Sequence, residues 1–266
     1  MCKPGRVADS EIADPRWRGL YIAGGVVALI AVVFFRRNFG TEMVAFGGFG
    51  FWNVPAVHPS TAAGWFTLLR DDPFVGLLLF DVIDLVNYAL VGLILLALYA
   101  ALHRAGRSAM AIATAFGLVG VAVYLASNHA FAMLSLSERH AAATTDAQRA
   151  MFLAAGEALL AIYNPGAIYQ GTGYYVGYSL VLLAGLIISI VMLRSRVFNR
   201  ATACAGILAN ALALTDFLVL AFAPALYGLP TVASALFRVA WMVLIALGLF
   251  RLGRRKPDEG GKRDDS

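Results

Sequence analysis

The stretch FVGLLLFDVIDLVNYALVGLILLALYAALHR, from Phe74 to Arg104, decides the fold class of this chain. Apart from Asp81 and Asp84, it carries no charged side chain before its basic end. A run of about 20 apolar residues crosses the hydrocarbon core of a bilayer as a helix, so this run predicts a transmembrane span. The two aspartates need an explanation, because ionisable groups within a membrane are costly and commonly functional.

The rest of the chain repeats this apolar pattern. Of its 266 residues, 60% are hydrophobic and 14% are charged, against roughly half and a quarter in soluble domains. The mean hydropathy is +0.74. We therefore predict an all-α, polytopic transmembrane bundle of six helices. The expected spans are Gly19–Phe35, Phe74–Leu102, Ser108–Leu136, Gly173–Leu193, Ala201–Ala223 and Thr231–Phe250.

Residues 19–250 are expected to form a single transmembrane domain. It follows a polar N-terminal segment, residues 1–18, and precedes a basic tail, residues 251–266, that is expected to be disordered. The cytoplasmic loops of membrane proteins are enriched in Lys and Arg. Most of the 21 Lys and Arg residues fall on the inner side if the N-terminus is inside. Both termini are therefore predicted to be cytoplasmic.

The second outer loop contains an apolar segment, Asp146–Tyr163, that is interrupted by Glu157. Its uninterrupted part is too short to span comfortably, so we predict an interfacial helix. The alternative is a seventh span, which would move Arg194–Arg200 and the basic tail to the outside, against the charge rule. The first outer loop carries FGGFGFW, Phe46–Trp52, which is interpreted as a hinged lid or as an interfacial anchor.

Four polar residues are predicted to lie together in the outer half of the membrane. The second and third spans form a hairpin, and reflection about its centre sets Asp81 and Asp84 opposite Asn128 and His129. Two neighbouring carboxylates favour uptake of a proton or a cation. The alternative is structural, with one acid paired to Arg238 and the other bonded to the helix backbone or to hydroxyls.

Asp216 and Arg238 lie equally far along the chain from the centre of the last hairpin. A straight hairpin sets them at one level, so we predict a structural ion pair. In the functional variant, Arg238 would anchor an anionic headgroup or carboxylate. No cofactor and no metal are expected, because His58 and His140 lie in loops, at the wrong depth to join His129 as haem ligands.

Several catalytic signatures are missing from the sequence. It has no Walker loop, no GxGxxG, no HExxH and no GxSxG, so a role other than an enzyme is favoured. The formal net charge of +5 comes mostly from the ends and short loops, which indicates topology rather than nucleic-acid binding. Membrane lipid is an expected partner, because the basic tail can contact anionic headgroups.

Three stretches carry a family resemblance: Phe74–Arg104, AFGLVGVAVYLASN (Ala115–Asn128) and Gly173–Leu214. The chain resembles, over most of Arg18–Leu252, a bacterial membrane family known as domain of unknown function 4386. In that family an aspartate often opens the second span, and the fourth ends in an S-x-x-(F/M)-x-R turn, which LRSRVFNRATACAG (Leu193–Gly206) looks like. The resemblance implies a bundle of six to seven helices in the bacterial cytoplasmic (inner) membrane. It brings no established activity.

Three functions are consistent with these features. The first is binding or transport of a small solute or ion through an outward-facing polar cluster of Asp81, Asp84, Asn128 and His129. The second is a non-catalytic membrane component that binds a partner protein or lipid, in which the acids serve packing alone. The third, an intramembrane enzyme that modifies lipid, ranks last because no nucleophile and base are visible together.

Overall fold

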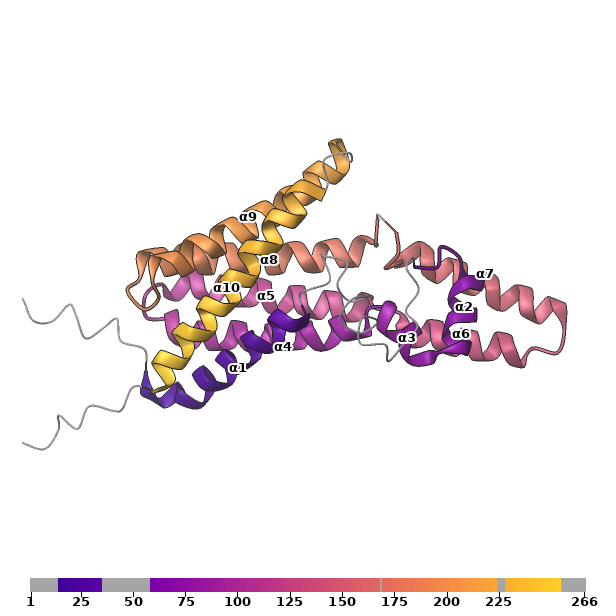
Figure 1. Ribbon diagram of the computed structural model, residues 1–266, viewed down its shortest axis with the longest axis horizontal. Helices are drawn as coiled ribbons and strands as arrows, with labels where there is room; N and C mark the ends of the chain where they lie inside the picture. Colours follow the sequence, from indigo (N-terminus) through magenta and orange to yellow (C-terminus); the bar gives the residue numbers. More distant parts are fainter. Residues whose placement is uncertain (1–13, 35–57, 168, 224–227, 255–266) are drawn as a thin grey trace, which may run out of the picture. The chain divides into compact units, whose positions relative to one another are not determined.

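The computed structural model describes residues 14–34, 58–167, 169–223 and 228–254 of the chain, and these residues form helices and no β-strands. They divide into two compact units (Figure 1). Unit 1 comprises residues 1–33, 90–117 and 182–266, and unit 2 comprises residues 34–89 and 118–181. The all-α class predicted from the sequence is confirmed. The aromatic stretch Phe46–Trp52 lies outside the described residues.

The helices have the following bounds in chain order: the 3-10 helix η2 Pro15–Trp17, α1 Arg18–Phe34, α2 Ala62–Asp71, α3 Pro73–Leu79, α4 Val82–Leu102, α5 Arg107–Ser127, α6 Ala130–Ala142, α7 Asp146–Ile162, α8 Thr172–Arg194, α9 Arg200–Phe222 and α10 Gly228–Arg254. The last helix therefore begins before the predicted sixth span and continues past it into the basic tail.

Five helical segments are long and apolar enough to cross a membrane: Val82–Leu102, Arg107–Ala142, Thr172–Arg194, Arg200–Phe222 and Pro230–Arg254. The protein is therefore a multi-pass membrane protein, as the sequence predicts. The first predicted span corresponds to α1, an apolar helix of 17 residues, which is shorter than the other five. The count of six spans stays a prediction, and so does the interfacial position of α7.

Two of the predicted spans are interrupted in the structure. The second, expected as one helix over Phe74–Leu102, ends as α3 at Leu79 and resumes as α4 at Val82. The third, expected over Ser108–Leu136, is broken after Ser127 and resumes as α6 at Ala130. Phe74–Leu102 is therefore not one continuous helix, whereas Arg107–Ala142 still counts as one candidate span despite its break. Hydropathy reports composition and does not detect a local change of backbone direction.

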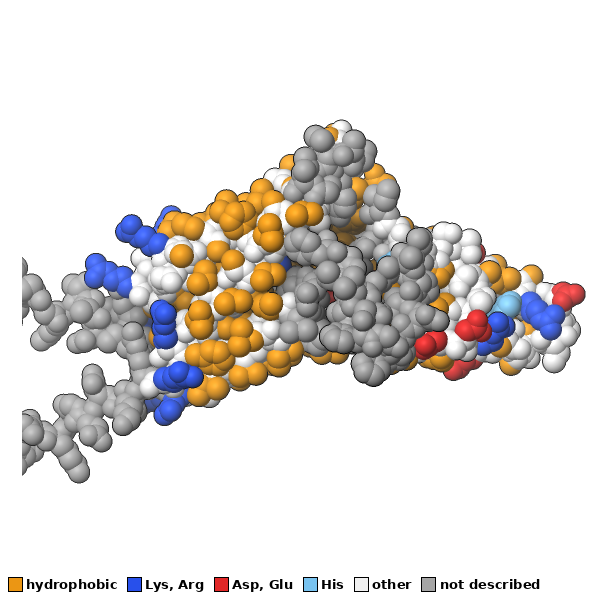
Figure 2. All heavy atoms as spheres, in the orientation of Figure 1, with side chains coloured by type: hydrophobic (Ala, Val, Ile, Leu, Met, Phe, Trp, Pro, Cys, Tyr) orange, Lys and Arg blue, Asp and Glu red, His pale blue; other side chains and the backbone are white. Residues whose placement is uncertain are grey.

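Unit 1 is packed through small residues. A Cβ added to Gly24 would lie 2.4 Å from the Cβ of Ala97, so α1 and α4 approach each other closely there. A Cβ on Gly206 of α9 would lie 2.2 Å from Ser189 Oγ and 2.4 Å from Trp241 Nε1. Small residues let membrane helices approach closely and gain dispersion energy. Lys and Arg side chains gather at one end of the apolar surface of this unit (Figure 2).

Unit 2 has a core of large side chains. Helix α2 packs against α6 and α7, and α3 packs against α2 and α6 (Figure 1). The buried residues of α2 recur at helical spacing as Ala62, Trp65, Phe66 and Leu69. The core cluster also includes Val75, Leu79, Phe80, Ala130, Met133, Leu160 and Tyr163. Burial of such side chains is the main stabilising contribution in a soluble domain.

Helix α2 lies in a segment that the sequence reading treated as a connection between spans. Its signals are local: Thr61 is the N-cap, and its hydroxyl accepts a hydrogen bond from the Gly64 N–H at 3.2 Å. At the same end, Glu157 of α7 accepts a hydrogen bond from the Ala62 N–H at 2.8 Å. The glutamate that interrupts an apolar run in the sequence therefore binds the start of a second helix.

Candidate functional site

The breaks in the two interrupted helices meet in unit 2. Asn128, in the break between α5 and α6, donates from Nδ2 to the carbonyl oxygens of Phe80 and Asp81, at 3.3 and 3.4 Å. Both carbonyls belong to the break between α3 and α4. The Asn128 Oδ1 accepts a hydrogen bond from the Ala130 N–H at 3.0 Å, at the start of α6. One amide side chain thus binds the backbone of both breaks, where the helical hydrogen bonds stop.

Asp81 forms the turn of the first break. Its φ is +65°, and it is the only non-glycine residue with positive φ among those described. The left-handed region costs an L-residue about 1–2 kcal/mol, and aspartate tolerates it better than most. The Asp81 carbonyl accepts the Asp84 N–H at 3.1 Å, which starts α4. The chain therefore reverses its local twist at this residue and begins a new helix.

The Asp81 carboxylate is buried, with 2% of the residue exposed. The Tyr163 hydroxyl donates a hydrogen bond to its Oδ2. Tyr163 is the C-cap of α7, and its ring lies 6.1 Å from that of Phe80, centroid to centroid. Trp65 packs edge-on against the same Phe80 ring at 4.8 Å. Aromatic rings therefore cover the acid from the side of α2 and α7.

Asp84 lies in the first turn of α4 and is 7% exposed. The Tyr124 hydroxyl of α5 donates to its Oδ2 at 3.1 Å. The Tyr124 ring stacks on that of Tyr88, with centroids 3.6 Å apart and an interplanar angle of 10°. One turn further along α4, the Asn87 Oδ1 is buried and has no hydrogen-bond partner among the described residues. The break and the first turns of α4 thus carry two carboxylates and an amide oxygen at three-residue intervals.

The structure brings together three of the four residues predicted for the polar cluster, namely Asp81, Asp84 and Asn128. The fourth, His129, is the N-cap of α6 and is half-buried, and its side chain makes no capping hydrogen bond. Tyr163 was missed by the sequence reading. It lies 82 residues from Asp81 along the chain, and no local pattern marks it as a partner.

Asp216 and Arg238, predicted as an ion pair, both lie in unit 1 and are 7% and 3% exposed. The Thr231 side chain of α10 forms a hydrogen bond with the Asp216 carboxylate, and Arg238 acts on that carboxylate electrostatically. The Asp216 Oδ1 has no hydrogen-bond partner among the described residues. The two charges are thus within electrostatic range of each other, and a direct ion pair between them stays a prediction.

Among the residues that the structure describes, His, Cys, Asp and Glu side chains do not form a group of three or more that could hold a metal ion. The site described above instead combines carboxylates, phenol hydroxyls and amides. Such groups can hold and transfer protons or bind a small cation.

Comparison with known proteins identifies the family of the chain. Residues 19–253 match the family described as Domain of unknown function (DUF4386). The chain belongs to this family. The match covers the four described ranges almost entirely, including both helix breaks and the residues around Asp81. Neither a curated protein nor a solved structure matches the chain.

Proposed function

We propose that this protein binds and transfers a small cation, in the first place a proton, at the cluster of Asp81, Asp84 and Asn128. The single observation that supports this most strongly is the meeting of two helix breaks at a buried carboxylate. Non-helical backbone at membrane depth is found where it is buried in protein or lines a path for solutes. Interrupted helices are also a recurrent way of building ion sites in transporters.

The chemistry of the cluster favours the smallest ligands. Asp81 lies in the break before α4 and Asp84 in the first turn of that helix, and the Asp84 N–H donates to the Asp81 carbonyl, so the two acids share one turn of the chain. Two buried carboxylates on one turn of the chain carry negative charge that a proton or a small cation would neutralise. Exposures of 2% and 7% leave little room for a bulky solute.

Two tyrosine hydroxyls provide a path for transfer of the bound proton. The Tyr163 and Tyr124 hydroxyls each donate to one of the two carboxylates. A hydroxyl both donates and accepts, so protonation of a carboxylate would reverse the direction of its hydrogen bond without moving heavy atoms far. The buried Asn87 Oδ1 supplies a further acceptor one turn away from Asp84. These groups together would form a short relay.

A second candidate function is that of a non-catalytic component that binds a lipid or a partner protein. One observation favours it: Asp81 and Asp84 stand at the N-terminus of α4, where negative charge is stabilised by the helix dipole. The acids would then hold the break in place and do nothing else. Substitution of the acids separates the two functions, because the second predicts lost stability without any change in proton transfer.

The proposed orientation has both termini in the cytoplasm of a bacterium and the chain in its inner membrane. The support is the basic end of unit 1 (Figure 2), since arginines occur at the ends of α1, α8, α9 and α10 and in the turn between α4 and α5. Positive residues are retained on the cytoplasmic side. Labelling of single cysteines introduced at Arg196 and Arg149 with an impermeant reagent on intact cells tests it. Reaction at position 149 alone is expected.

The function is tested in liposomes that contain the purified full-length chain and an internal pH dye. We expect an imposed pH gradient to collapse faster than in empty liposomes, and the Asp81→Asn and Asp84→Asn variants to slow the collapse at least tenfold. Asparagine keeps the shape and tolerates the left-handed backbone, so it removes the charge alone. Asp71→Asn is the matched control, because that side chain is 62% exposed.

Infrared difference spectra on acidification supply a second readout. A protonated carboxylic acid band that is lost in Asp81→Asn supports the proposal independently of transport. The proposal fails if neither acid changes the proton flux or the spectrum while the folded fraction is unchanged.

A further inference from the structure

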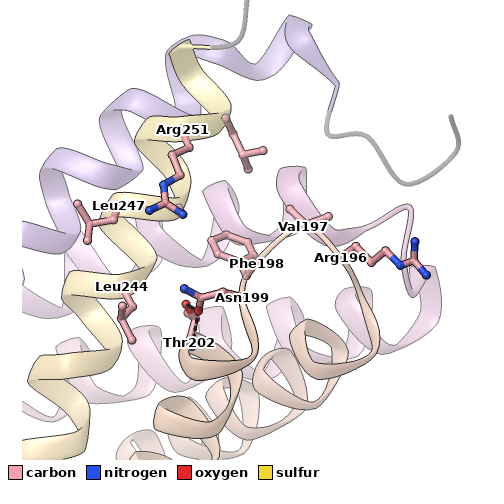
Figure 3. Close-up of a pocket in the computed structure, with 10 residues that line it drawn as sticks. Arg196, Val197, Phe198, Asn199, Thr202, Leu244, Leu247 and Arg251 are labelled. Atoms are coloured by element: carbon pink, nitrogen blue, oxygen red, sulfur yellow. Dashed lines mark hydrogen bonds between the residues drawn. The ribbon is translucent and has the colours of Figure 1, made fainter. Parts of the chain in front are cut away.

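A cavity of about 280 Å³ lies in unit 1, where the loop between α8 and α9 faces the last turns of α10 (Figure 3). Ligand pockets usually range from about 300 to 1,000 Å³, so this one has the size of a small ligand or a headgroup.

The polar groups in the wall carry one sign of charge. Arg196 and Arg251 are among the lining residues, and none of the described residues that line the cavity is acidic. Figure 3 shows the Arg251 side chain directed from α10 toward the loop that carries Phe198 and Asn199, whereas Arg196 points away. A guanidinium offers several N–H donors in a fork that fits carboxylates and phosphates. The wall therefore selects an anion, with Arg251 as its main contact.

Asn199 and Thr202 line the cavity on the side of α9. Asn199 is the N-cap of α9, and its Oδ1 accepts from the Thr202 N–H at 2.7 Å and from the Thr202 hydroxyl at 2.6 Å. These bonds occupy the oxygen of the amide, so the side-chain group of Asn199 that remains for a ligand is its Nδ2 donor. The cavity thus meets Arg251 and a second donor at the positive end of a helix of 23 residues.

The rest of the wall is apolar. Phe198, Leu244 and Leu247 line the cavity, and Leu247 is 48% exposed. In a multi-pass membrane protein, an exposed leucine beside an arginine cluster at a helix end belongs at the level where acyl chains join headgroups. An anion that enters here can keep its charge on Arg251 and lay a hydrocarbon tail along Leu244 and Leu247.

From these contacts we infer that the cavity binds the phosphate group of an anionic phospholipid, with Arg251 as the recognition residue. The phosphodiester would accept hydrogen bonds from the Arg251 guanidinium and from Asn199 Nδ2. The acyl chains would stay outside the cavity on the apolar surface of α10. This inference uses residues of unit 1 alone and does not rest on the proposed proton site.

The test uses the full-length protein in a neutral detergent, with native mass spectrometry to count bound lipids. Phosphatidylglycerol, phosphatidylcholine and inorganic phosphate are the probes. We expect phosphatidylglycerol to bind more tightly than phosphatidylcholine, and Arg251→Gln to weaken its binding about tenfold, as expected for loss of a charged hydrogen bond. Arg254→Gln removes one charge from the same exposed helix end and is the matched control, expected to change binding less than twofold.

Each outcome decides the inference. Equal losses for Arg251→Gln and Arg254→Gln would mean that surface charge alone attracts the lipid, and the inference would be wrong. Displacement of bound lipid by millimolar phosphate would identify free phosphate as the ligand of the same site instead. Phosphatidylcholine binding as tightly as phosphatidylglycerol would remove the anion specificity and overturn the assignment.

If Arg251→Gln folds poorly, a second pair of variants tests the same inference. Leu247→Glu puts a negative charge at the exposed mouth of the cavity, and Leu247→Gln has nearly the same shape without the charge. We expect the glutamate to weaken phosphatidylglycerol binding severalfold more than the glutamine does. Equal effects of the two substitutions would contradict an anion in the cavity.

Discussion

Units 1 and 2 both bring helices close together at glycines, but unit 2 adds a core of buried rings. The glycine contacts include those of Gly24 with Ala97 and Gly206 with Trp241 in unit 1, and of Gly120 with Gly177 in unit 2. In unit 2 the core is built around buried rings, with Trp65 at 0% and Phe80 at 0% exposure. Helices in lipid gain little by hiding apolar side chains from one another, so close backbone approach matters more there than bulk. The core of α2, α3, α6 and α7 is instead filled with large apolar side chains.

The surfaces follow the same contrast. The exposed side chains of α2, α6 and α7 include charges of both signs, among them Arg70, Asp71 and Arg149. Such a surface suits water or headgroups, whereas the unit 1 helices expose leucine, isoleucine and valine. One chain thus combines helices with an apolar surface and helices whose surface carries charges of both signs. The substitutions below test where each kind of packing applies.

The largest effect is expected for Trp65→Ala. The side chain is fully buried among Phe66, Leu69 and Phe80, and its removal leaves a large void in unit 2. Truncation of a buried aromatic costs about 3–5 kcal/mol of unfolding free energy. Unfolding in detergent, followed by limited proteolysis at α2 and α7, measures it. Cleavage that appears equally in α9 and α10 would show that the two units unfold as one.

Gly206→Ala tests the close packing of helices at glycine in unit 1. The added Cβ would meet Ser189 Oγ and Trp241 Nε1 below 2.5 Å, so these side chains or the helices that carry them must shift. Overpacking of this kind costs about 2–3 kcal/mol. Gly19→Ala is the control, because a Cβ there meets nothing within 4 Å. If both alanines leave the thermal midpoint unchanged, close packing at glycine is not what holds unit 1 together.

Asn128→Ala tests the meeting of the two helix breaks. It deprives the Phe80 and Asp81 carbonyls of a donor and leaves the start of α6 without the Asn128 cap. We expect a loss of about 1–2 kcal/mol and faster amide exchange at the start of α4. Asn164→Ala is a suitable comparison, since the Asn164 side chain accepts a hydrogen bond from the exposed Gly166 N–H in a loop, away from both helix breaks. Similar exchange at α4 in the two variants would contradict a bridging role.

The smallest effect is expected for Arg149→Gln. Arg149 pairs with Asp146 at 3.1 Å, but the two side chains are 50% and 99% exposed. Solvent-exposed pairs contribute little to stability, so thermal unfolding should match that of the unchanged protein within error. A clear loss would indicate that α7 is buried against lipid or a partner in the full membrane.

The sequence was sufficient for the helical class and for the bounds of two of the later spans, and insufficient for the helix breaks and the site. Runs such as Gly173–Leu193 and Ala201–Ala223 coincide with α8 and α9 within a few residues, because length and hydropathy alone determine such helices. Hairpin reflection also set Asn128 near Asp81, which the structure shows. The breaks themselves were invisible, since neither holds a proline or a glycine. Tyr163 reaches the site through a fold that local pattern does not encode.

The left-handed turn at position 81 also restricts how this chain can change over evolution. Asparagine or glycine at this position would keep the turn, whereas valine or isoleucine would favour one continuous helix through α3 and α4. A continuous helix would turn the face of α3 relative to that of α4 and move the Phe80 carbonyl out of reach of Asn128. We therefore expect the shape of residue 81, and not only its charge, to be under selection.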